Sequence, residues 1–258
     1  MVGSSYSFCH VYISFLLVAM LLLLGPYSAY SSDQKVTVSL YYETLCPYCA
    51  NFIVNSLVKV FEKGLISIVD LRLIPWGNGW IQSDGSLSCQ FFFSFDETSL
   101  LNAAQHGPDE CLLNAIEACA INVYPDVNRH FRFVYCIERL TLEGRHNEWG
   151  SCFGEAKMGS SPVDCYNKGN GYMLERKFAG ETARLNPPRR FVPWVVVDGQ
   201  ALQEDFQNFV SYICRAYRGS QIPEACTSLP STIDSFEENS ENSVCYAGEL
   251  NNSTSFRH

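Results

Sequence analysis

Two cysteines separated by two residues stand where a strand-like segment meets a helix-like one. The motif is Cys46-Pro47-Tyr48-Cys49, which follows the alternating run 35–42 and precedes the helical run 50–63. The free N–H groups and the macrodipole at a helix N-terminus stabilise a thiolate, the reactive form of cysteine. This context predicts a redox pair in which Cys46 attacks a disulfide and Cys49 resolves the mixed disulfide.

The residues between the two cysteines have expected roles of their own. Pro47 fits the first helical turn, where no N–H is needed, and Tyr48 either shapes access to the pair or is a partly buried helical residue. The alternatives for the motif are half of a zinc site or a structural disulfide. A zinc site needs two further ligands, usually in a second CxxC or an HxxxH, and the sequence has neither spacing. We therefore expect no metal and no other cofactor.

The N-terminus is typical of a secretory leader. The run 13–24 is almost entirely apolar, Gly25-Pro26 ends it, and small residues at 28, 29 and 31 suit cleavage near 29–31. The run is shorter than the roughly 20 residues that span a bilayer. We expect residues 1–30 to be removed as a signal peptide, which leaves the chain in the secretory pathway without a membrane attachment. Because the leader lacks Lys and Arg, a retained signal anchor is the alternative.

A secreted chain meets oxidising conditions, in which cysteines pair. Of the 12 cysteines, Cys9 lies in the leader, Cys46 and Cys49 form the redox pair, and Cys245 lies in a polar tail. Eight remain, enough for up to four structural bridges whose connectivity the sequence leaves open. They are Cys89, Cys111, Cys119, Cys136, Cys152, Cys165, Cys214 and Cys226. A local Cys214–Cys226 bridge is the one pairing that we predict from spacing.

The chain divides into one domain, residues 33–226, and a tail, residues 227–258. The tail is rich in Ser, Asn and Glu, so we expect it to be disordered. Asn251 and Asn252 begin two overlapping glycosylation sequons there. The tail is acidic and so is the domain, since the net charge is −9 and the tail accounts for −4 of it. An acidic domain offers no surface for nucleic acid.

The order of expected elements predicts the fold class. A strand at 36–40, the helix after the CxxC motif and a second apolar run at 66–74 indicate a βαβ unit with parallel strands. A mostly helical block, 110–185, follows, with breaks near Pro125, near Gly144 and at 159–162. A short strand at 194–197 and an amphipathic helix at 204–217 complete the domain. We predict an α/β, thioredoxin-like fold with a helical insertion, stapled by disulfides.

A second set of residues resembles the signature of the gamma-interferon-inducible lysosomal thiol reductase family, C-Q-H-G-x-x-E-C-x-x-N-x-x-x-x-C. Its members in this sequence are Cys89, Gln90, His106, Gly107, Glu110, Cys111, Asn114 and Cys119. Pro75-Trp76-Gly77-Asn78 and the segments 187–188 and 191–195 also match the family. The resemblance spans about residues 35–226 and implies a thioredoxin-like reductase of protein disulfides.

The signature is interrupted after Gln90. Excising residues 91–105 joins Gln90 to His106 and restores the signature unbroken. We interpret this segment as an insertion, and our hypothesis for its origin is a retained intron or a gene-model error, which transcript sequencing tests. If the segment is real, its apolar run 91–95 is either a contact surface or packs on the body. The insertion also weakens the case for a bridge between Cys89 and Cys111.

Three further expectations concern the positions of signature and loop residues. Cys111 and Cys119 lie two turns apart on one helix, too far to bond each other, so each needs a different partner. His106 is either a hydrogen-bonded structural residue or tunes a nearby thiol. The resemblance implies that Val192-Pro193 is a cis-proline loop against the CxxC motif, where the Val192 backbone pairs with an extended substrate. The alternative is a trans proline that opens an edge strand.

The motif and the resemblance together predict a thiol reductase of the lysosome, the vacuole or the extracellular space. Its partners are disulfide-bonded proteins and a small-molecule or protein thiol as reductant. A thiol of pKa ~8.5 is only about 0.03% ionised near pH 5, so the helix terminus must lower the pKa of Cys46, because the sequence shows no nearby Lys or Arg. The alternatives are a thiol oxidase or isomerase with the same cysteines, or a non-enzymatic disulfide-stapled binding module.

Overall fold

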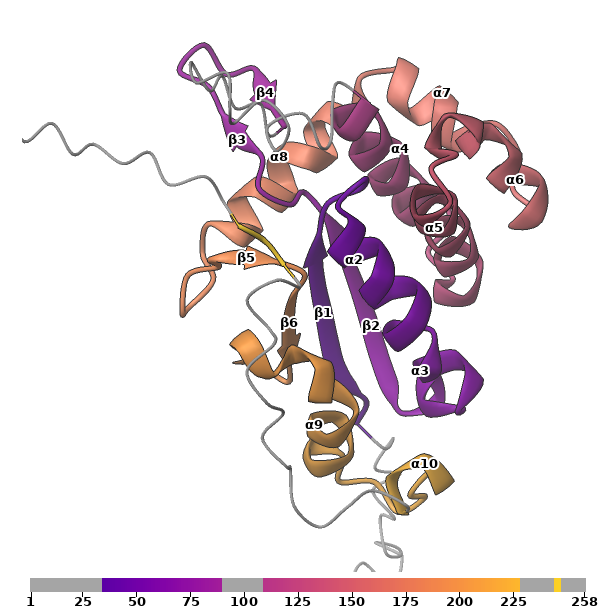
Figure 1. Ribbon diagram of the computed structural model, residues 1–258, viewed down its shortest axis with the longest axis vertical. Coiled ribbons are helices and arrows are strands. Elements are labelled where there is room, and N and C mark those ends of the chain that lie inside the picture. Colours follow the sequence, from indigo (N-terminus) through magenta and orange to yellow (C-terminus); the bar gives the residue numbers. More distant parts are fainter. Residues whose placement is uncertain (1–33, 90–108, 228–243, 247–258) are drawn as a thin grey trace, which may run out of the picture. The chain divides into compact units, whose positions relative to one another are not determined.

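Apolar residues, alternating at first and then continuous, build the central strand of the sheet. The computed structural model describes residues 34–89, 109–227 and 244–246, and the main sheet has the order β2-β1-β6-β7 (Figure 1). β1 (Val36–Tyr42) runs parallel to β2 (Val69–Pro75) and antiparallel to β6 (Trp194–Val197). β7 (Gln200–Ala201) pairs with β6 at the edge. Because β1 is central and almost wholly buried, the loop that leaves it begins inside the protein.

The connection from β1 to β2 is the predicted helix, and it confirms the parallel βαβ unit. It consists of α2 (Pro47–Phe52), a π-helical turn (Ile53–Leu57) and α3 (Lys59–Glu62), followed by a 3₁₀ turn (Leu65–Ser67). Its fully buried side chains face the sheet and α9, and Phe52 packs edge-on against Phe206 and Phe209 with ring centroids 5.5 and 5.4 Å away. This packing anchors the helix whose first turn carries the cysteine motif.

The helical block is also confirmed, with ends at the predicted breaks. Its members are α4 (Asp109–Val123), α5 (Val127–Leu142), a 3₁₀ turn (His146–Ser151), α6 (Cys152–Glu155), α7 (Ser161–Asn167) and α8 (Asn170–Thr182). Asp126 caps α5, since its Oδ1 accepts from the backbone N–H of Asn128 at 3.1 Å. α4 and α8 contact β2, and α5 contacts α2 (Figure 1). The block therefore braces the βαβ unit.

The chain then returns to the sheet and closes the domain. β5 (Phe191–Val192) precedes β6, a 3₁₀ turn (Gln203–Asn208) leads into α9 (Phe209–Ala216), and α10 (Glu224–Thr227) follows. The predicted Cys214–Cys226 bridge is present and joins α9 to α10. A separate hairpin, β3 (Trp80–Ile81) with β4 (Leu87–Ser88), follows β2.

The tail departs from the expected disorder at two places. Thr227 ends α10, and residues 245–246 form a strand, β8 (Cys245–Tyr246), which pairs antiparallel with β5. Figure 1 shows β8, in yellow, beside β5. Backbone pairing and a disulfide hold this short segment in spite of its polar surroundings in the sequence.

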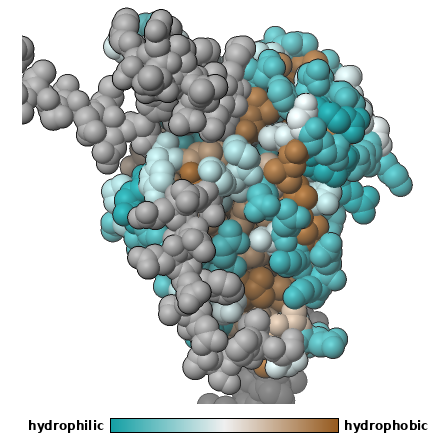
Figure 2. All heavy atoms as spheres, viewed as in Figure 1, coloured by the Kyte–Doolittle hydropathy of each residue, from teal (hydrophilic) through white to brown (hydrophobic). Residues whose placement is uncertain are grey.

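These elements make up a thioredoxin-like α/β fold with a helical insertion, stapled by disulfides, as predicted. In Figure 2, apolar side chains gather in the middle of the viewed face, over α2 and towards α3 and α9. No helix among the described residues has the length and apolar character needed to cross a membrane. Several predictions fall outside those residues: the leader 1–30, the insertion 91–105, Gln90, His106, Gly107, Asn251 and Asn252.

Candidate redox site

Cys46 is the N-cap of α2. Its backbone is extended (φ −69°, ψ 116°), and its Sγ accepts a long hydrogen bond, 3.5 Å, from the backbone N–H of Cys49. Pro47 occupies the first helical turn, as predicted, and Tyr48 is half-buried against the core. The Cys46 sulfur therefore lies at the helix N-terminus, within reach of the Cys49 N–H, a position that favours a thiolate.

The disulfide at this site is not between the two cysteines of the motif. Cys46 is bonded to Cys245, 199 residues later, with the two Cα atoms 6.6 Å apart. Cys49 is fully buried and is the free cysteine of the described residues. The sequence analysis places Cys245 outside the site, and this is wrong, because β8 brings Cys245 directly to the helix N-terminus. The motif thus holds one bonded sulfur and one thiol, a single turn apart.

The cis-proline prediction is confirmed. The Val192–Pro193 peptide bond is cis, and a second cis bond, Asn186–Pro187, was not predicted. Val192 stands opposite Cys245 in the β5–β8 ladder, and Phe191 stands opposite Tyr246. The backbone of Val192 therefore pairs with an extended segment, as expected for a substrate, but the segment belongs to this chain's own tail.

Glu43, three residues before the motif, is a further residue of the site. It is fully buried, and its carboxylate lies within 4.8 Å of the sulfurs of both Cys46 and Cys245. Its Oε2 accepts from the backbone N–H of Asn78 at 2.7 Å, and its Oε1 accepts from the Asn78 side-chain amide at 3.3 Å. Among the described residues, Glu43, Cys46 and Cys245 lie close enough together to be potential metal ligands. Two of the three ligand atoms, however, are the sulfurs of the disulfide.

Asn78 connects this carboxylate to the tail and to a cation. Its side-chain amide also donates to the carbonyl of Cys245 at 3.2 Å, and its Oδ1 accepts from Arg189. Arg189 is half-buried and comes from the segment before β5. The sequence analysis found no cation near the motif, so Arg189 is a correction. The sequence signal for Asn78 and Arg189 was that the segment 75–78 and the segments flanking Arg189 match the family. Such a match does not tell which side chains contact each other.

Gly77 explains why this turn tolerates no larger residue. Its φ is +57°, and a Cβ atom would lie 2.1 Å from the Cβ of Glu43. Both the left-handed backbone and the lack of space therefore require glycine. The segment Pro75-Trp76-Gly77-Asn78 thus acts as a close-packed turn that delivers Asn78 to the buried carboxylate.

Burial controls the titration of the site. Burial raises the pKa of Glu43 to about 7, against the lowering effects of the Asn78 N–H and the Arg189 charge. Burial, followed by the negative charge of Glu43, raises the pKa of the Cys49 thiol well above its ordinary value, although the backbone N–H of Glu43 donates to the thiol. Burial lowers the pKa of Arg189. Cys49 is therefore a neutral thiol that needs a base before it can attack.

More buried carboxyl groups lie beneath the motif. Burial raises the pKa of Glu117 to about 8, although the Tyr42 hydroxyl donates to its Oε2 at 2.6 Å. Burial, with the charges of neighbouring acids, raises the pKa of both Glu138 and Glu175 well above the ordinary value. We name Glu43, Glu117, Glu138 and Glu175 the buried acids. Glu43 and Glu138, together with Glu110, make the interior around Cys49 unfavourable for further negative charge.

The signature helix holds the loop that precedes the motif. The Oδ1 of Asn114 accepts from the backbone N–H of Thr44 at 2.9 Å and from its hydroxyl at 3.0 Å. The Thr44 hydroxyl also lies 3.2 Å from the carbonyl of Glu110, which it can reach as a donor. Asn114 and Glu110 are one turn apart on α4, so this face of the helix fixes the loop two residues before Cys46.

The eight remaining cysteines form four bridges, as predicted in number. Cys89 bonds Cys111 in spite of the interruption between them, with the Cα atoms 5.5 Å apart. Cys119 bonds Cys165, which confirms that Cys111 and Cys119 have different partners. Cys136 bonds Cys152, and these last two bridges join α4 to α7 and α5 to α6. The last two bridges stabilise the helical block, and none of the four includes a cysteine of the redox motif.

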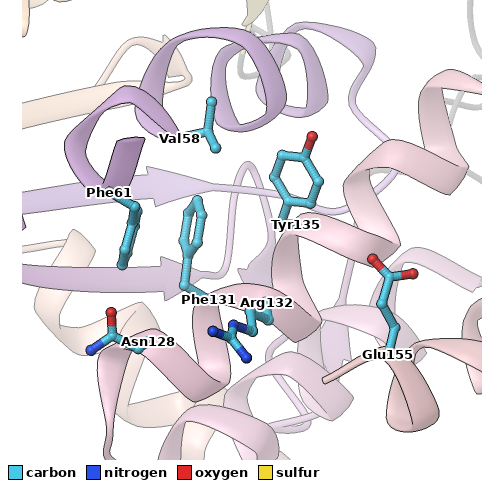
Figure 3. A pocket seen from close by; sticks show the side chains of 7 residues that line it. All are labelled: Val58, Phe61, Asn128, Phe131, Arg132, Tyr135 and Glu155. Carbon is cyan, nitrogen blue, oxygen red and sulfur yellow. The ribbon is translucent and has the colours of Figure 1, made fainter. Parts of the chain in front are cut away.

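Hollows in the described surface include two that differ in their position relative to the redox site. One, of about 390 Å³, borders the site, since Trp76 and Arg189 line it together with the exposed Trp80. The other, of about 280 Å³, lies between α3 and α5 (Figure 3). Phe61 and Phe131 stack in its wall with ring centroids 4.1 Å apart, and its lining shares no residue with the redox site. The first hollow is therefore the one placed to contact a bound chain.

Comparisons with known proteins identify the family. The family model described as gamma interferon inducible lysosomal thiol reductase matches residues 37–156. A gamma-interferon-responsive lysosomal thiol protein of Arabidopsis thaliana is 36% identical over 222 residues, 84% of this chain and 87% of the relative. The gamma-interferon-inducible lysosomal thiol reductase of Mus musculus is 30% identical over 227 residues, 87% of this chain and 81% of the relative.

Among solved structures, reduced DsbA from Mycobacterium tuberculosis superimposes with a TM-score of 0.48 at 19% identity, over 78% of this chain and 90% of that one. The sequence relatives carry the assignment, since their identity extends over most of both chains. The chain belongs to the gamma-interferon-inducible lysosomal thiol reductase family, and it is a thiol–disulfide oxidoreductase.

Proposed function

We propose that this protein reduces disulfide bonds in other proteins, with Cys46 as the nucleophile and Cys49 as the resolving thiol. One observation carries the proposal. Cys46 is joined to a cysteine on an extended segment that pairs with the backbone beside the cis proline, while the free Cys49 waits one turn away. This arrangement is that of a mixed disulfide between enzyme and substrate, poised for resolution.

The reaction consists of two exchanges and a regeneration. The Cys46 thiolate attacks one sulfur of the substrate disulfide, and the other substrate sulfur leaves with the electron pair and takes a proton. The Cys49 thiolate then attacks the Sγ of Cys46, and the second substrate sulfur leaves in the same way. The substrate has gained two electrons, and Cys46 and Cys49 are joined. Two molecules of a thiol, or one dithiol, return the pair to its reduced form.

Glu43 is suited to transfer a proton in these reaction steps, in which thiols lose and regain protons. Its pKa of about 7 is in the range in which a carboxyl group can both accept and return a proton near neutrality. Below pH 7 it is mainly protonated, so it places no negative charge beside the sulfur of Cys46, from which it is less than 4.8 Å away. The neutral state therefore favours the Cys46 thiolate in an acidic compartment.

For the compartment, we propose the secretory pathway with the lysosome or vacuole as its end. The support is the leader-like N-terminus together with the word lysosomal in the names of both relatives. Residues 33–226 are the proposed reductase domain, and Asn251 and Asn252 are candidate glycosylation sites in the tail. Expression with a fluorescent tag after residue 258, with and without residues 1–30, tests the proposed localisation.

Insulin reduction tests the chemistry. Wild type, Cys46→Ser and Cys49→Ser are compared at pH about 5 and about 7 with a thiol reductant. We expect Cys46→Ser to lose the catalysed rate, and Cys49→Ser to accumulate a mixed disulfide with insulin, because the resolving thiol is missing. Equal rates in wild type and Cys46→Ser would contradict the mechanism. A Cys46 disulfide that resists dithiothreitol as strongly as the Cys136–Cys152 bridge would instead favour a binding module.

A further inference from the structure

Residues 244–246 of the tail lie against β5 and the N-terminus of α2, beside the cis proline. Cys245 is bonded to the nucleophile, and its carbonyl accepts from the Asn78 amide at 3.2 Å. Val244, the preceding residue, is buried with 7% of its surface exposed. The ring of Tyr246, the following residue, meets the ring of Phe191 edge-on at 6.0 Å. Main-chain pairing, a side-chain bond and two apolar contacts therefore all engage this segment.

We propose that Val244-Cys245-Tyr246 is an internal pseudosubstrate that occupies the substrate cleft and, through the Cys46–Cys245 bond, keeps the enzyme latent. The proposal rests on the proposed function of Cys46. It also describes the substrate class: an extended segment with an apolar residue directly before its cysteine and a side chain that can rest on Phe191 after it. β-strand addition of this kind provides affinity from the backbone and selectivity from alternate side chains.

This bridge differs in kind from the other four. The Cys89, Cys119, Cys136 and Cys214 bridges join neighbouring segments of the body, and none involves the CxxC motif. The Cys46 bridge uses the sulfur at a helix N-terminus, and the backbone N–H of the free Cys49 already reaches that sulfur at 3.5 Å. A bond with an attacking thiol one turn away is an exchangeable bond, not a permanent staple.

The release step is balanced and needs no external oxidant. A base removes the Cys49 proton, and the thiolate attacks the Sγ of Cys46. The Cys46–Cys49 bond forms, the Cys46–Cys245 bond breaks, and the Cys245 sulfur leaves with the electron pair and takes a proton. The tail is then free, and no electrons are gained or lost. A thiol reductant subsequently reduces the Cys46–Cys49 pair, and the enzyme enters its cycle with an open cleft.

A tethered segment is a strong competitor. Linking a binding segment to its site within one chain gives an effective concentration on the order of millimolar. A disulfide peptide at roughly 100 µM therefore competes at a disadvantage of about tenfold. We expect the protein as purified without reductant to show an initial rate about tenfold below that of Cys245→Ser.

The test uses the chain without its leader, purified under oxidising conditions, and a quenched fluorescent disulfide peptide with valine before cysteine. Limiting glutathione starts the reaction. We expect a longer lag in wild type than in Cys245→Ser, whose Cys46–Cys49 pair needs only reduction. Val244→Asp keeps the thiol but cannot bury its side chain, so its lag should be intermediate. Cys214→Ser with Cys226→Ser removes a bridge that does not involve the motif and should keep the lag.

Mass mapping of the alkylated, unreduced protein provides the second readout. A peptide pair joining Cys46 to Cys245, with Cys49 alkylated after unfolding, supports the latch. Cys46 found bonded only to Cys49, or a wild type that starts as fast as Cys245→Ser, overturns it. If fully prereduced wild type fails to reduce the peptide at all, the proposed function itself is wrong. If prereduced wild type is active but oxidised wild type starts as fast as oxidised Cys245→Ser, the latch alone is wrong.

Discussion

At the scale of single residues, the site depends on where two ionisable groups, Glu43 and Arg189, lie relative to two sulfurs. Glu43 stands beside the Cys46 sulfur, Arg189 reaches the same network through Asn78, and Cys49 is held neutral by burial. A carboxylate this close to a thiolate raises its free energy, whereas a neutral carboxyl group does not. The protonation of Glu43 therefore sets how reactive Cys46 is at a given pH.

Replacing Glu43 with glutamine should change the pH dependence of Cys46 alkylation. The comparison is made in a reduced Cys245→Ser background. Near pH 5 the two proteins should react at similar rates, because Glu43, with a pKa of about 7, is protonated and neutral. Above pH 7 the wild-type carboxylate disfavours the thiolate, so Glu43→Gln should react faster, on the order of tenfold. Iodoacetamide kinetics with peptide mapping measure the rate, and the exposed Glu62→Gln is the control. Parallel profiles in Glu43→Gln and wild type would exclude this role.

At the scale of elements, one helix and one turn hold the motif in place. α4 binds the loop before Cys46 through Asn114, and the turn at Gly77 presents Asn78 to Glu43. Both contacts join segments that are far apart in the sequence. The precision of the site therefore comes from packing between elements and not from the CxxC helix alone.

Removing the Asn114 side chain should loosen the loop. Asn114→Ala leaves the buried N–H and hydroxyl of Thr44 without this acceptor, which costs about 1–3 kcal/mol of the free energy of unfolding. The exposed Asn122→Ala on the same helix should cost almost nothing. Denaturant titration measures both, and the rate of insulin reduction should fall only in Asn114→Ala. A double-mutant cycle with Thr44→Val checks the contact, since additive effects would rule out the coupling.

At the scale of the molecule, local sequence patterns predicted the helices and strands, whereas long-range contacts determine which side chains form the site. Hydrophobic periodicity gives β1, the βαβ unit and the breaks of the helical block, because each depends on neighbours in the sequence. The CxxC motif and the cis proline can be recognised in the sequence because each needs a particular residue type, cysteine or proline. Glu43, Asn78 and Arg189 have no such signature, since their meaning comes from burial and from partners that only folding brings close.

The sequence did contain a signal that Cys245 is reactive, but the polar composition of the tail obscured it. Without the leader's Cys9, the chain has an odd number of cysteines, and an odd cysteine in a secreted protein is a candidate reactive thiol. The polar composition around it predicted disorder, and that prediction counted against any role. A strand of two residues is too short for a periodicity, so β8 is visible only through its pairing with β5.

The buried acids make the whole molecule sensitive to pH. Glu117 has a pKa of about 8 and Glu43 of about 7 in the folded protein, against 4.5 for an ordinary glutamate. Between about pH 4.5 and 8 the unfolded chain has released these protons while the folded protein still binds them. The unfolded state then binds fewer protons, so the free energy of unfolding falls as the pH rises through this window. Below it the stability is fully present, and above it the loss is complete.

We therefore expect the protein to be more stable at pH 5 than at pH 8, by an amount on the order of a few kcal/mol. Glu117→Gln removes one titrating group and keeps an acceptor for the Tyr42 hydroxyl, so its stability should change less between the two pH values. Denaturant titrations of the disulfide-intact proteins measure the difference, and the exposed Glu62→Gln should follow wild type. A free energy of unfolding that increases from pH 5 to pH 8 would show that the buried acids are already ionised in the folded state. A fall that is equally steep in Glu117→Gln would assign the pH dependence to the other buried acids.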